Sequence, residues 1–332
     1  MKPRILLTAA TGKTGFPTTV KLLQEGYPVR IFVRSRNTKA LELERLGAEI
    51  ALGNFDNRDQ LRAALMGVER VYYCYPIKKG LPHDIGLYIE AARETRVEAT
   101  VFMGQWLAQF DDQKSVHTNE IRQAYQLLEA SGLNVVYFTP GYFGFSTFQV
   151  PLEFAVQMGL LFSSLGQGRN PVISEKDMAR VLVELLKNPA PYYGQRLRPT
   201  GPRSLSMRDI AEAIGRVTGR KVRVVNTPDF LFVKAAYFSG PDFGVDPFQV
   251  SQAVHYNHEF QRDKFNIGGP TSVVRDVTGQ EPEPVEATIR RYIAESGYGM
   301  PSRAGWWQAL KKFMVMPLTK TPSLRQLELL NQ

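Results

Sequence analysis

A turn near the N-terminus combines residue types and spacing that suit phosphate binding. The apolar run 5–7 leads directly into Thr8-Ala9-Ala10-Thr11-Gly12-Lys13-Thr14-Gly15, and a helix is predicted to follow. Positions 9, 12 and 15 have the spacing of the three glycines of a dinucleotide-binding turn, with alanine at the first position. A strand, a turn and a helix N-terminus place backbone N–H groups and the positive end of the helix dipole together. We therefore predict a nucleotide phosphate site here.

Gly12-Lys13-Thr14 also resembles the end of the phosphate-binding loop of NTPases. That motif requires a glycine at position 7, where the chain has Leu7 inside the expected strand. The apolar run at 71–75 ends in Pro76 and not in an aspartate that binds magnesium. The sequence therefore disfavours an NTPase.

The end of the second expected strand indicates which dinucleotide binds. NAD sites place an Asp or Glu about 20 residues after the turn, where it binds the ribose 2′-hydroxyl. This chain has Arg34 at that place and no carboxylate beside it. Because a guanidinium pairs with a 2′-phosphate, the sequence predicts NADP(H). A solvated arginine at a strand end is the alternative interpretation.

The proton donor of a reductase is harder to assign. Tyr75 and Lys79 have the Tyr-x-x-x-Lys spacing in which the lysine lowers the pKa of a catalytic tyrosine. They lie at a strand end that contains Pro76, so the two side chains cannot align on one helical turn. The helix expected over 117–131 has no lysine but begins with His117. A histidine there can protonate a reduced product near neutral pH, or it can simply cap or pack.

The remaining reactive side chains do not indicate a metal. His255 and His258 lack the carboxylate partners and spacing of a known metal site, and we expect them on a surface helix. The single cysteine, Cys74, excludes an intramolecular disulfide and favours a reducing compartment such as the cytoplasm. We predict no bound metal.

The elements that must position these residues alternate between strand and helix. Such alternation requires crossover connections, and it predicts a doubly wound α/β fold, the Rossmann arrangement, with helices on both faces of a parallel sheet. Strands are expected near 4–8, 28–33, 49–52, 70–75, 99–103 and 134–139, and helices near 13–25, 38–46, 58–66, 83–96 and 117–131.

The second half has longer loops and a different organisation. Helices are expected there at 176–187 and at 206–218, the latter capped by Ser206 with Asp209 three residues on. We divide the chain into an NADP-binding domain over 1–150, a smaller, mostly helical substrate-binding region over 151–300 that interleaves with the sheet, and a basic extension over 301–332. The extension contains Trp306-Trp307 and a predicted helix that packs on its own core or on a subunit partner. A helix lying on a membrane surface is the alternative.

Composition restricts the class of protein further. The 332 residues are 43% hydrophobic and 22% charged, as in ordinary globular chains. No apolar run approaches the roughly 20 residues that a membrane span needs. The net charge of +9 is spread along the chain and forms no basic run. We therefore expect a soluble protein without a transmembrane segment and without a nucleic-acid partner.

Taken in order, these motifs resemble those of the NmrA-like group of atypical short-chain dehydrogenases/reductases. The similarity extends over nearly the whole chain to about residue 295. The matching segments are Thr8 to Gly15, Val29 to Arg34, Gly53-Asn54-Phe55-Asp56-Asn57, Ala91-Ala92-Arg93-Glu94, Ser131-Gly132-Leu133, Thr139-Pro140-Gly141-Tyr142-Phe143, Asp177-Met178-Ala179, and Thr200-Gly201-Pro202 with Leu205-Ser206.

The resemblance implies roles for the matched residues. Ala10, Thr11, Gly12, Lys13, Thr14 and Gly15 are implied to hold the pyrophosphate, Arg34 the 2′-phosphate, Phe55 and Asp56 the adenine, Tyr75 and Pro76 the nicotinamide ribose, and Gly104 and Gln105 the nicotinamide end. Pro140, Gly141, Tyr142 and Phe143 are implied to line the nicotinamide end too. We predict that these four residues also contact the substrate, together with Trp106, which belongs to a cluster of aromatic residues.

Members of this group are reductases of phenolics, quinones or imines, or regulators that sense NADPH without turnover. The lysine missing from 117–131 argues against phenolic-ether chemistry. Aromatic side chains predict an apolar cleft, and we predict direct hydride transfer from NADPH to a small conjugated quinone, enone or imine. An NADP(H)-binding redox sensor is the alternative, and a homodimer is compatible with the sequence. The aromatic residues concerned are Trp106, Phe110, Tyr142, Phe143, Phe145, Phe148, Phe230, Phe232, Tyr237, Phe238 and Phe243.

Overall fold

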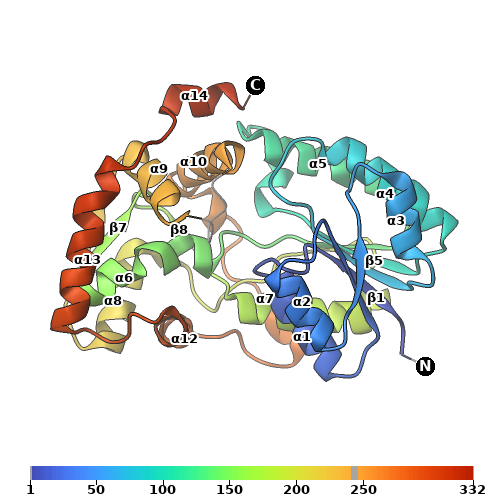
Figure 1. The fold of residues 1–332 in the computed structure, drawn as a ribbon, viewed down its shortest axis with the longest axis horizontal. Coiled ribbons are helices and arrows are strands. Elements are labelled where there is room, and N and C mark those ends of the chain that lie inside the picture. Colours follow the sequence, from blue (N-terminus) through green and yellow to red (C-terminus); the bar gives the residue numbers. More distant parts are fainter. Residues whose placement is uncertain (1, 241–245, 332) are drawn as a thin grey trace.

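A seven-stranded sheet forms the core of the N-terminal half in the computed structural model, which describes residues 2–240 and 246–331 (Figure 1). Its order is β3-β2-β1-β4-β5-β6-β9, and all neighbouring strands are parallel. The order reverses between β1 and β4, where doubly wound sheets bind ligands. The strands are β1 (Ile5–Thr8), β2 (Val29–Val33), β3 (Glu49–Leu52), β4 (Arg70–Tyr73), β5 (Ala99–Met103), β6 (Val135–Phe138) and β9 (Arg196–Leu197).

Helices cover both faces of this sheet, each over its own apolar cluster. All four residues of β1 and all five of β2 are buried, as parallel strands between two helical layers require. The predicted doubly wound α/β fold is confirmed. One face carries α1 (Gly15–Gln24), α2 (Thr38–Arg45), α7 (Glu175–Lys187) and α11 (Val273–Thr278), and the other α3 (Arg58–Leu65), α4 (Leu81–Glu94) and α5 (Val116–Ala130).

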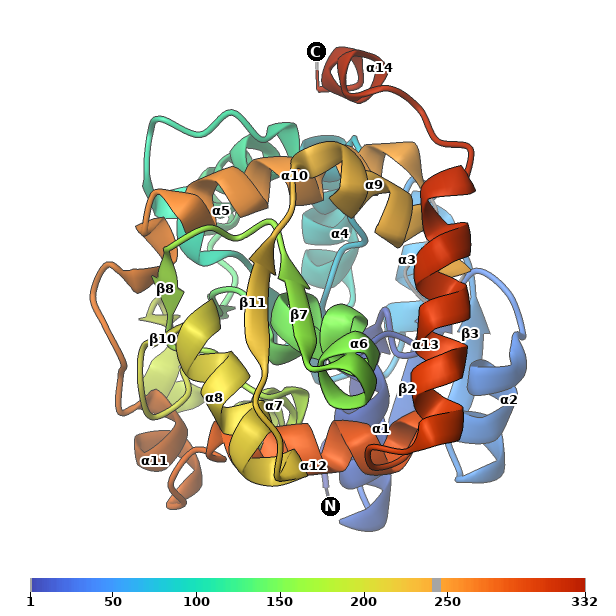
Figure 2. The same ribbon diagram turned by 90° about the vertical axis from the view of Figure 1, so that its left-hand side faces the viewer.

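The second half builds a smaller helical layer with two short sheets around a third apolar cluster (Figure 2). The expected cap of α8 is confirmed, because Ser206 and Asp209 form a capping box. Since α7 and β9 return to the large sheet, residues 151–300 contribute to both halves. The elements are α6 (Val150–Met158), β7 (Leu160–Ser163), β8 (Arg169–Asn170), β10 (Leu205–Ser206), α8 (Met207–Thr218), β11 (Arg223–Asn226), α9 (Asp229–Phe238), α10 (Pro247–Gln261) and α12 (Val285–Ser296).

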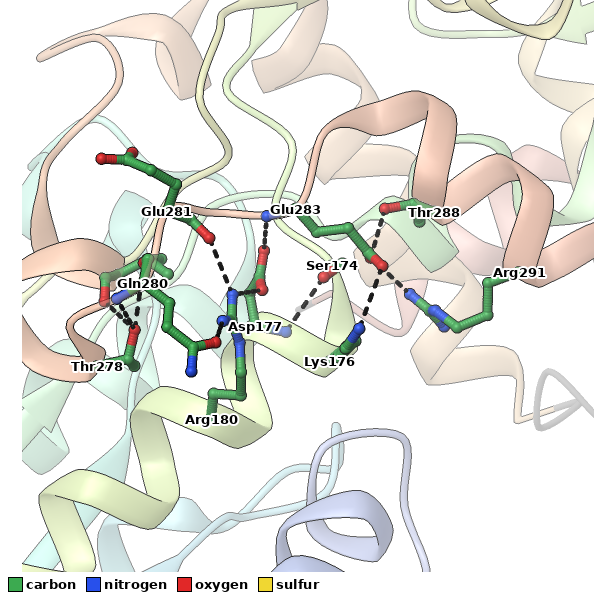
Figure 3. Close-up of polar contacts among 11 residues, drawn as sticks. Ser174, Lys176, Asp177, Arg180, Thr278, Gln280, Glu281, Glu283, Thr288 and Arg291 are labelled. Carbon is green, nitrogen blue, oxygen red and sulfur yellow. Dashed lines mark hydrogen bonds and ion pairs between the residues drawn. The ribbon is translucent and has the colours of Figure 1, made fainter. Parts of the chain in front are cut away.

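Asp177, from the Asp177-Met178-Ala179 motif, connects α7 to the loop before α12 (Figure 3). Its carboxylate is fully buried, pairs with Arg180, and accepts a 2.7 Å hydrogen bond from the backbone N–H of Glu283. Glu283 in turn pairs with Arg291 at 3.1 Å. A buried carboxylate with these partners stabilises the junction between the two halves, so this motif has a structural role.

The C-terminal extension forms α13 (Arg303–Val315), a short 3₁₀ turn η6 (Met316–Leu318) and α14 (Leu324–Leu329). Figures 1 and 2 show α13 along the outer side of the molecule beside α6, with α14 beyond α9 and α10. Helix α13 packs against α6, in agreement with the prediction that it packs on the protein's own core. Trp306 and Trp307 remain 37% and 59% exposed. Within the described ranges, no helix is long and apolar enough to span a membrane.

Candidate cofactor and substrate site

The turn between β1 and α1 is built for close approach of a ligand to the backbone. Ala9, the alanine at the first glycine position, has a left-handed φ of 48°, a conformation that glycine adopts without strain. The N–H of Gly12 donates to the carbonyl of Ala9 at 2.9 Å and closes the turn. A Cβ on Gly15 would lie 2.4 Å from that same oxygen. The turn therefore requires a residue without a side chain at Gly15, and it leads into the N-terminus of α1, where N–H groups lack helical partners.

Arg34 follows the last residue of β2 and has an exposed side chain. Its neighbour Arg36 forms an ion pair with Glu44 at 2.5 Å, whereas Arg34 has no ion-pair partner within residues 2–240 and 246–331. A guanidinium without an ion-pair partner at the end of β2, in a fold whose phosphate turn requires glycine at position 15, suits a dinucleotide with a 2′-phosphate.

Arg34→Ala should weaken NADPH binding by about 10- to 150-fold and leave NADH binding nearly unchanged, because only NADPH carries the phosphate. Titration of protein fluorescence with each nucleotide measures both affinities. Arg36→Ala is the matched control, since that side chain is already paired. Equal losses for NADPH and NADH in the Arg34 variant would contradict the assignment.

The residues implied to border the adenine and the ribose differ in environment. Phe55 is buried and packs edge-on against Tyr75, with ring centroids 5.0 Å apart, while Asp56 is exposed. The Tyr75 hydroxyl donates to Asp84 at 2.6 Å, and burial, together with that carboxylate, raises the pKa of Tyr75 far above its ordinary value. Tyr75 therefore acts as a fixed, neutral wall, and its hydroxyl pairs with Asp84 and not with an ammonium group of Lys79.

A cavity of about 710 Å³ begins beside the phosphate turn and extends into the second half of the chain. It brings together residues from the first turn, from the carboxyl ends of β4 and β5, from α5, and from the segment after β6. Of the residues implied for cofactor and substrate, those that line it are Thr14, Tyr75, Gly104, Gln105, Pro140, Gly141, Tyr142 and Phe143, and His117 joins them.

The cavity wall contains no Asp, Glu, Lys or Arg among the described residues that line it. Its aromatic members are Tyr75, Tyr142, Phe143, Phe145, Phe154, Phe162, Phe232, Phe238, Tyr256, Phe265 and Phe313. A charged ligand would lose its hydration here without gaining a counter-charge. The cavity is therefore suited to uncharged, largely apolar molecules.

Gly104 and Gln105 are held in place by Tyr125 of α5. A Cβ on Gly104 would lie 2.0 Å from the Tyr125 hydroxyl oxygen, so the two groups are in close contact. That oxygen accepts a 2.9 Å hydrogen bond from the N–H of Gln105. The Gln105 side-chain oxygen accepts one from the Thr118 hydroxyl at 2.6 Å. This wall of the cavity is thus rigid and defined by α5.

His117 lines the cavity, but it does not suit the role predicted from sequence. The side chain is 5% exposed, and burial lowers its pKa from 6.5 to about 4. Its Nδ1 atom has no hydrogen-bond partner within the described ranges. Near neutral pH the imidazole is therefore uncharged, and it gives up its remaining N–H proton far less readily than an imidazolium would, so burial argues against the predicted role as a proton donor.

Tyr256 of α10 is a cavity residue that the sequence analysis missed. Its hydroxyl is buried and makes no hydrogen bond with any described residue. Burial raises the pKa of Tyr256, while Ser115, Gln105 and Thr118 are close enough to oppose that shift. An unpartnered phenol that keeps its proton, near Gln105, is the polar group best placed to act on a ligand. No motif surrounds it, so sequence reasoning had no signal to follow.

Several other expectations need correction. Trp106 lies outside the cavity lining, because Arg198 stacks on its ring at 3.8 Å and its Nε1 donates to the carbonyl of Lys264. His258 does have a carboxylate partner, Asp229 at 2.7 Å, and α10 is largely buried and not a surface helix. Among the described residues no cluster of metal-binding side chains occurs. Pro76, Phe110, Phe148, Phe230 and Tyr237 also do not line the cavity, and Phe243 lies outside the described residues.

The chain is similar to known proteins in both sequence and fold. The family model described as the NmrA-like family matches residues 1–289. The chain is 29% identical to an NAD(P)H azoreductase of Xenophilus azovorans over 222 residues, which are 67% of this chain and 76% of that protein.

Two solved structures share the fold. An NADPH-dependent quinone oxidoreductase of Escherichia coli in complex with NADPH has a TM-score of 0.72 at 17% identity, and the match covers 86% of this chain and 99% of that one. A triphenylmethane reductase of Citrobacter sp. has a TM-score of 0.74 at 15% identity, with 88% and 99% covered. At such identities the likeness shows the common architecture.

Proposed function

Since the chain belongs to the NmrA-like family, we propose that it is a reductase that transfers hydride directly from NADPH to an uncharged, conjugated organic substrate. The protein is an NAD(P)H-dependent oxidoreductase that takes NADP(H). The finer substrate class, a quinone, an enone or an imine, is our inference from the site.

The observation that carries this proposal is the uncharged, aromatic cavity that adjoins the phosphate turn. Thr14, Gly104 and Gln105, which we predict to contact the dinucleotide, also line this cavity, so the two ligands would meet there. The relatives named above are an azoreductase, a quinone oxidoreductase and a triphenylmethane reductase, and azo compounds, quinones and triphenylmethane dyes all contain a conjugated system that can accept hydride. The chemistry of the cavity and that of the relatives support the same substrate class.

NADPH, when bound, supplies the hydride. The residues of this chain position and shield the reactants: Ala10 to Gly15 would hold the pyrophosphate, and Arg34 the 2′-phosphate. Gly104 and Gln105, fixed by Tyr125, would border the nicotinamide. The apolar wall excludes water, so orientation contributes much of the rate.

We assign the role of proton donor to Tyr256. After hydride arrives, an enone substrate becomes an enolate, and the Tyr256 hydroxyl would give it a proton. The resulting phenolate would take a proton back from water when the product leaves, while the hydroxyls of Thr118 and Ser115, 3.0 Å apart, lie near Tyr256 and would stabilise its charge. A quinone needs no such donor, because its reduced anion takes a proton from water.

The test is NADPH oxidation over a panel of uncharged quinones, enones and cyclic imines. We expect turnover of uncharged members, and a kcat/KM lower by about 10-fold or more for a sulfonated quinone of the same ring system, since the cavity offers it no counter-charge. The measurement is the loss of NADPH absorbance. NADPH binding without turnover of any member would contradict the proposed substrate class, and preference for the sulfonate would contradict the assigned cavity.

A further inference from the structure

The C-terminal extension forms part of the cavity, although it lies beyond the residues that the family model matches. Phe313 of α13 and Met316 and Pro317 of η6 line the cavity, whereas the match to the NmrA-like family ends at residue 289. We propose that this end of the cavity is a distal subsite for an uncharged apolar or aromatic part of the substrate, and that the extension determines which substrates fit. The proposal rests on the proposed function in that it extends the same site.

Three phenylalanine rings build the subsite. Phe313 stacks on Phe162 of β7, with centroids 5.3 Å apart and an angle of 16° between the rings. Phe154 of α6 meets Phe162 edge-on at 5.6 Å and Phe313 at 6.4 Å. All three line the cavity. Aromatic faces and edges at these separations offer good contacts for another ring or an alkyl chain.

The extension is fastened to α6 at the start of α13. The buried Gln157 side chain donates to the carbonyls of Tyr298, Gly299 and Met300 at 3.1 to 3.2 Å, and accepts from the N–H of Ser302 at 3.1 Å. Such a fully used amide holds the chain at this point. A Cβ on Gly305 would lie 2.2 Å from the Gln157 oxygen, which shows how closely the first turn of α13 meets α6. Further along, Lys312 pairs with Glu153 at 2.7 Å.

The other end of the extension is fastened to the helices that cover the cavity. The Lys234 ammonium of α9 donates to the carbonyl of Thr319 at 2.8 Å. Leu327 is buried in a small apolar cluster with residues of α9 and α10. The Asn331 side chain accepts from the N–H of Val116 at 3.0 Å and from Gln252 at 3.1 Å. Attachment at both ends makes Phe313 a fixed wall of the cavity and not a loose tail.

The chemistry of the subsite defines its occupant. The subsite adds apolar area to a cavity whose described lining residues carry no Asp, Glu, Lys or Arg. At about 710 Å³ the whole cavity exceeds what one ring bordered by a nicotinamide would fill. The substrate is therefore an elongated uncharged molecule, with its conjugated acceptor at Gln105 and a second ring or an alkyl chain at Phe313.

Two quinones that differ only in their tail test this proposal. Ubiquinone-0 has the reactive ring alone, and decylubiquinone carries the same ring with an alkyl chain. Binding of each to the NADP⁺ complex is measured by calorimetry, which needs no turnover. In the wild-type protein we expect decylubiquinone to bind more tightly. Phe313→Ala should reduce this advantage by roughly 10- to 100-fold, the loss of contact with one phenyl ring, and leave ubiquinone-0 nearly unchanged.

Trp307→Ala is the matched control, because it removes an aromatic side chain from the same helix on the exposed side. In this variant the ratio of the affinities for decylubiquinone and ubiquinone-0 should equal that of the wild-type protein. Phe313→Leu, which keeps apolar bulk, should restore most of the advantage and guards against misfolding of the alanine variant. Equal affinities of the two quinones, or equal behaviour of the Phe313→Ala and Trp307→Ala variants, would overturn the subsite. Binding with a tail advantage but without NADPH oxidation would overturn the proposed function and leave the subsite standing.

Discussion

Gly15→Ala should weaken NADPH binding by roughly 100- to 10,000-fold, the loss of two charge-assisted contacts to the pyrophosphate. The new Cβ would lie 2.4 Å from the carbonyl oxygen of Ala9 and 2.8 Å from the Cα of Ala10. Both atoms belong to the backbone, so no side chain can turn aside. The turn has to move, and the N–H groups that face the phosphates move with it.

Gly86→Ala is the control for this substitution. Gly86 also lies in a helix of the first half, and a Cβ there would meet no atom within 4 Å. The Gly86→Ala variant should bind NADPH with the affinity of the wild-type protein, and it should be slightly more stable, because alanine favours helices. Calorimetric titration with NADPH measures the affinities, and thermal melting checks that each variant is folded. A folded Gly15→Ala variant with unchanged affinity would move the dinucleotide to another site.

Tyr256→Phe should lower kcat for an enone by about 100- to 10,000-fold, the contribution of one general acid, and leave kcat for a quinone nearly unchanged. The phenol is buried in the cavity wall, and burial holds its pKa above the ordinary value, so it keeps its proton throughout the neutral range. A substrate that collects its proton from water does not need it. The ratio of enone to quinone turnover is therefore the informative measurement.

His117→Ala is the control for the proton donor, and pH separates the two candidates. With its pKa lowered to about 4, His117 is an imidazolium only in acid, so catalysis by that form would fall as pH rises through that value. Catalysis through Tyr256 would be level across neutral pH. A Tyr256→Phe variant that retains full activity on the enone, or a rate that falls steadily above pH about 4, would contradict the assignment to Tyr256.

The parts of the site that the sequence predicted are those encoded by short segments. The strand, turn and helix around Gly12 lie within one stretch of chain, and Arg34 follows the next strand, so spacing alone was enough to predict a role for both. The alternation of strands and helices also predicted that the strands of the sheet are parallel, because parallel strands need helical crossovers. In a doubly wound fold the carboxyl ends of the strands meet at one edge, which brought Tyr75 and Gly104 to the same cavity.

The parts that were missed depend on packing between distant segments. Tyr256 reaches the cavity because α10 is buried, yet that helix carries Gln252, Asn257 and Glu259, which read as a solvated face. Gln252 and Asn257 are buried because they have partners in distant segments, such as the Tyr142 hydroxyl, which donates to the Asn257 oxygen at 2.8 Å. His117 was placed correctly, but its pKa depends on burial, which spacing along the chain does not reveal.

The attachment of Asn331 beside the start of α5 has a consequence for the order in which the protein is completed during translation. The contact joins positions 116 and 331, which are 215 residues apart. The last strand of the large sheet ends at Leu197, so the sheet can assemble on the ribosome long before the extension has been synthesised. Until then Phe154 and Phe162 lack their third ring and the wall is open. In a nascent chain the large sheet can therefore form before the Phe313 wall of the cavity is in place.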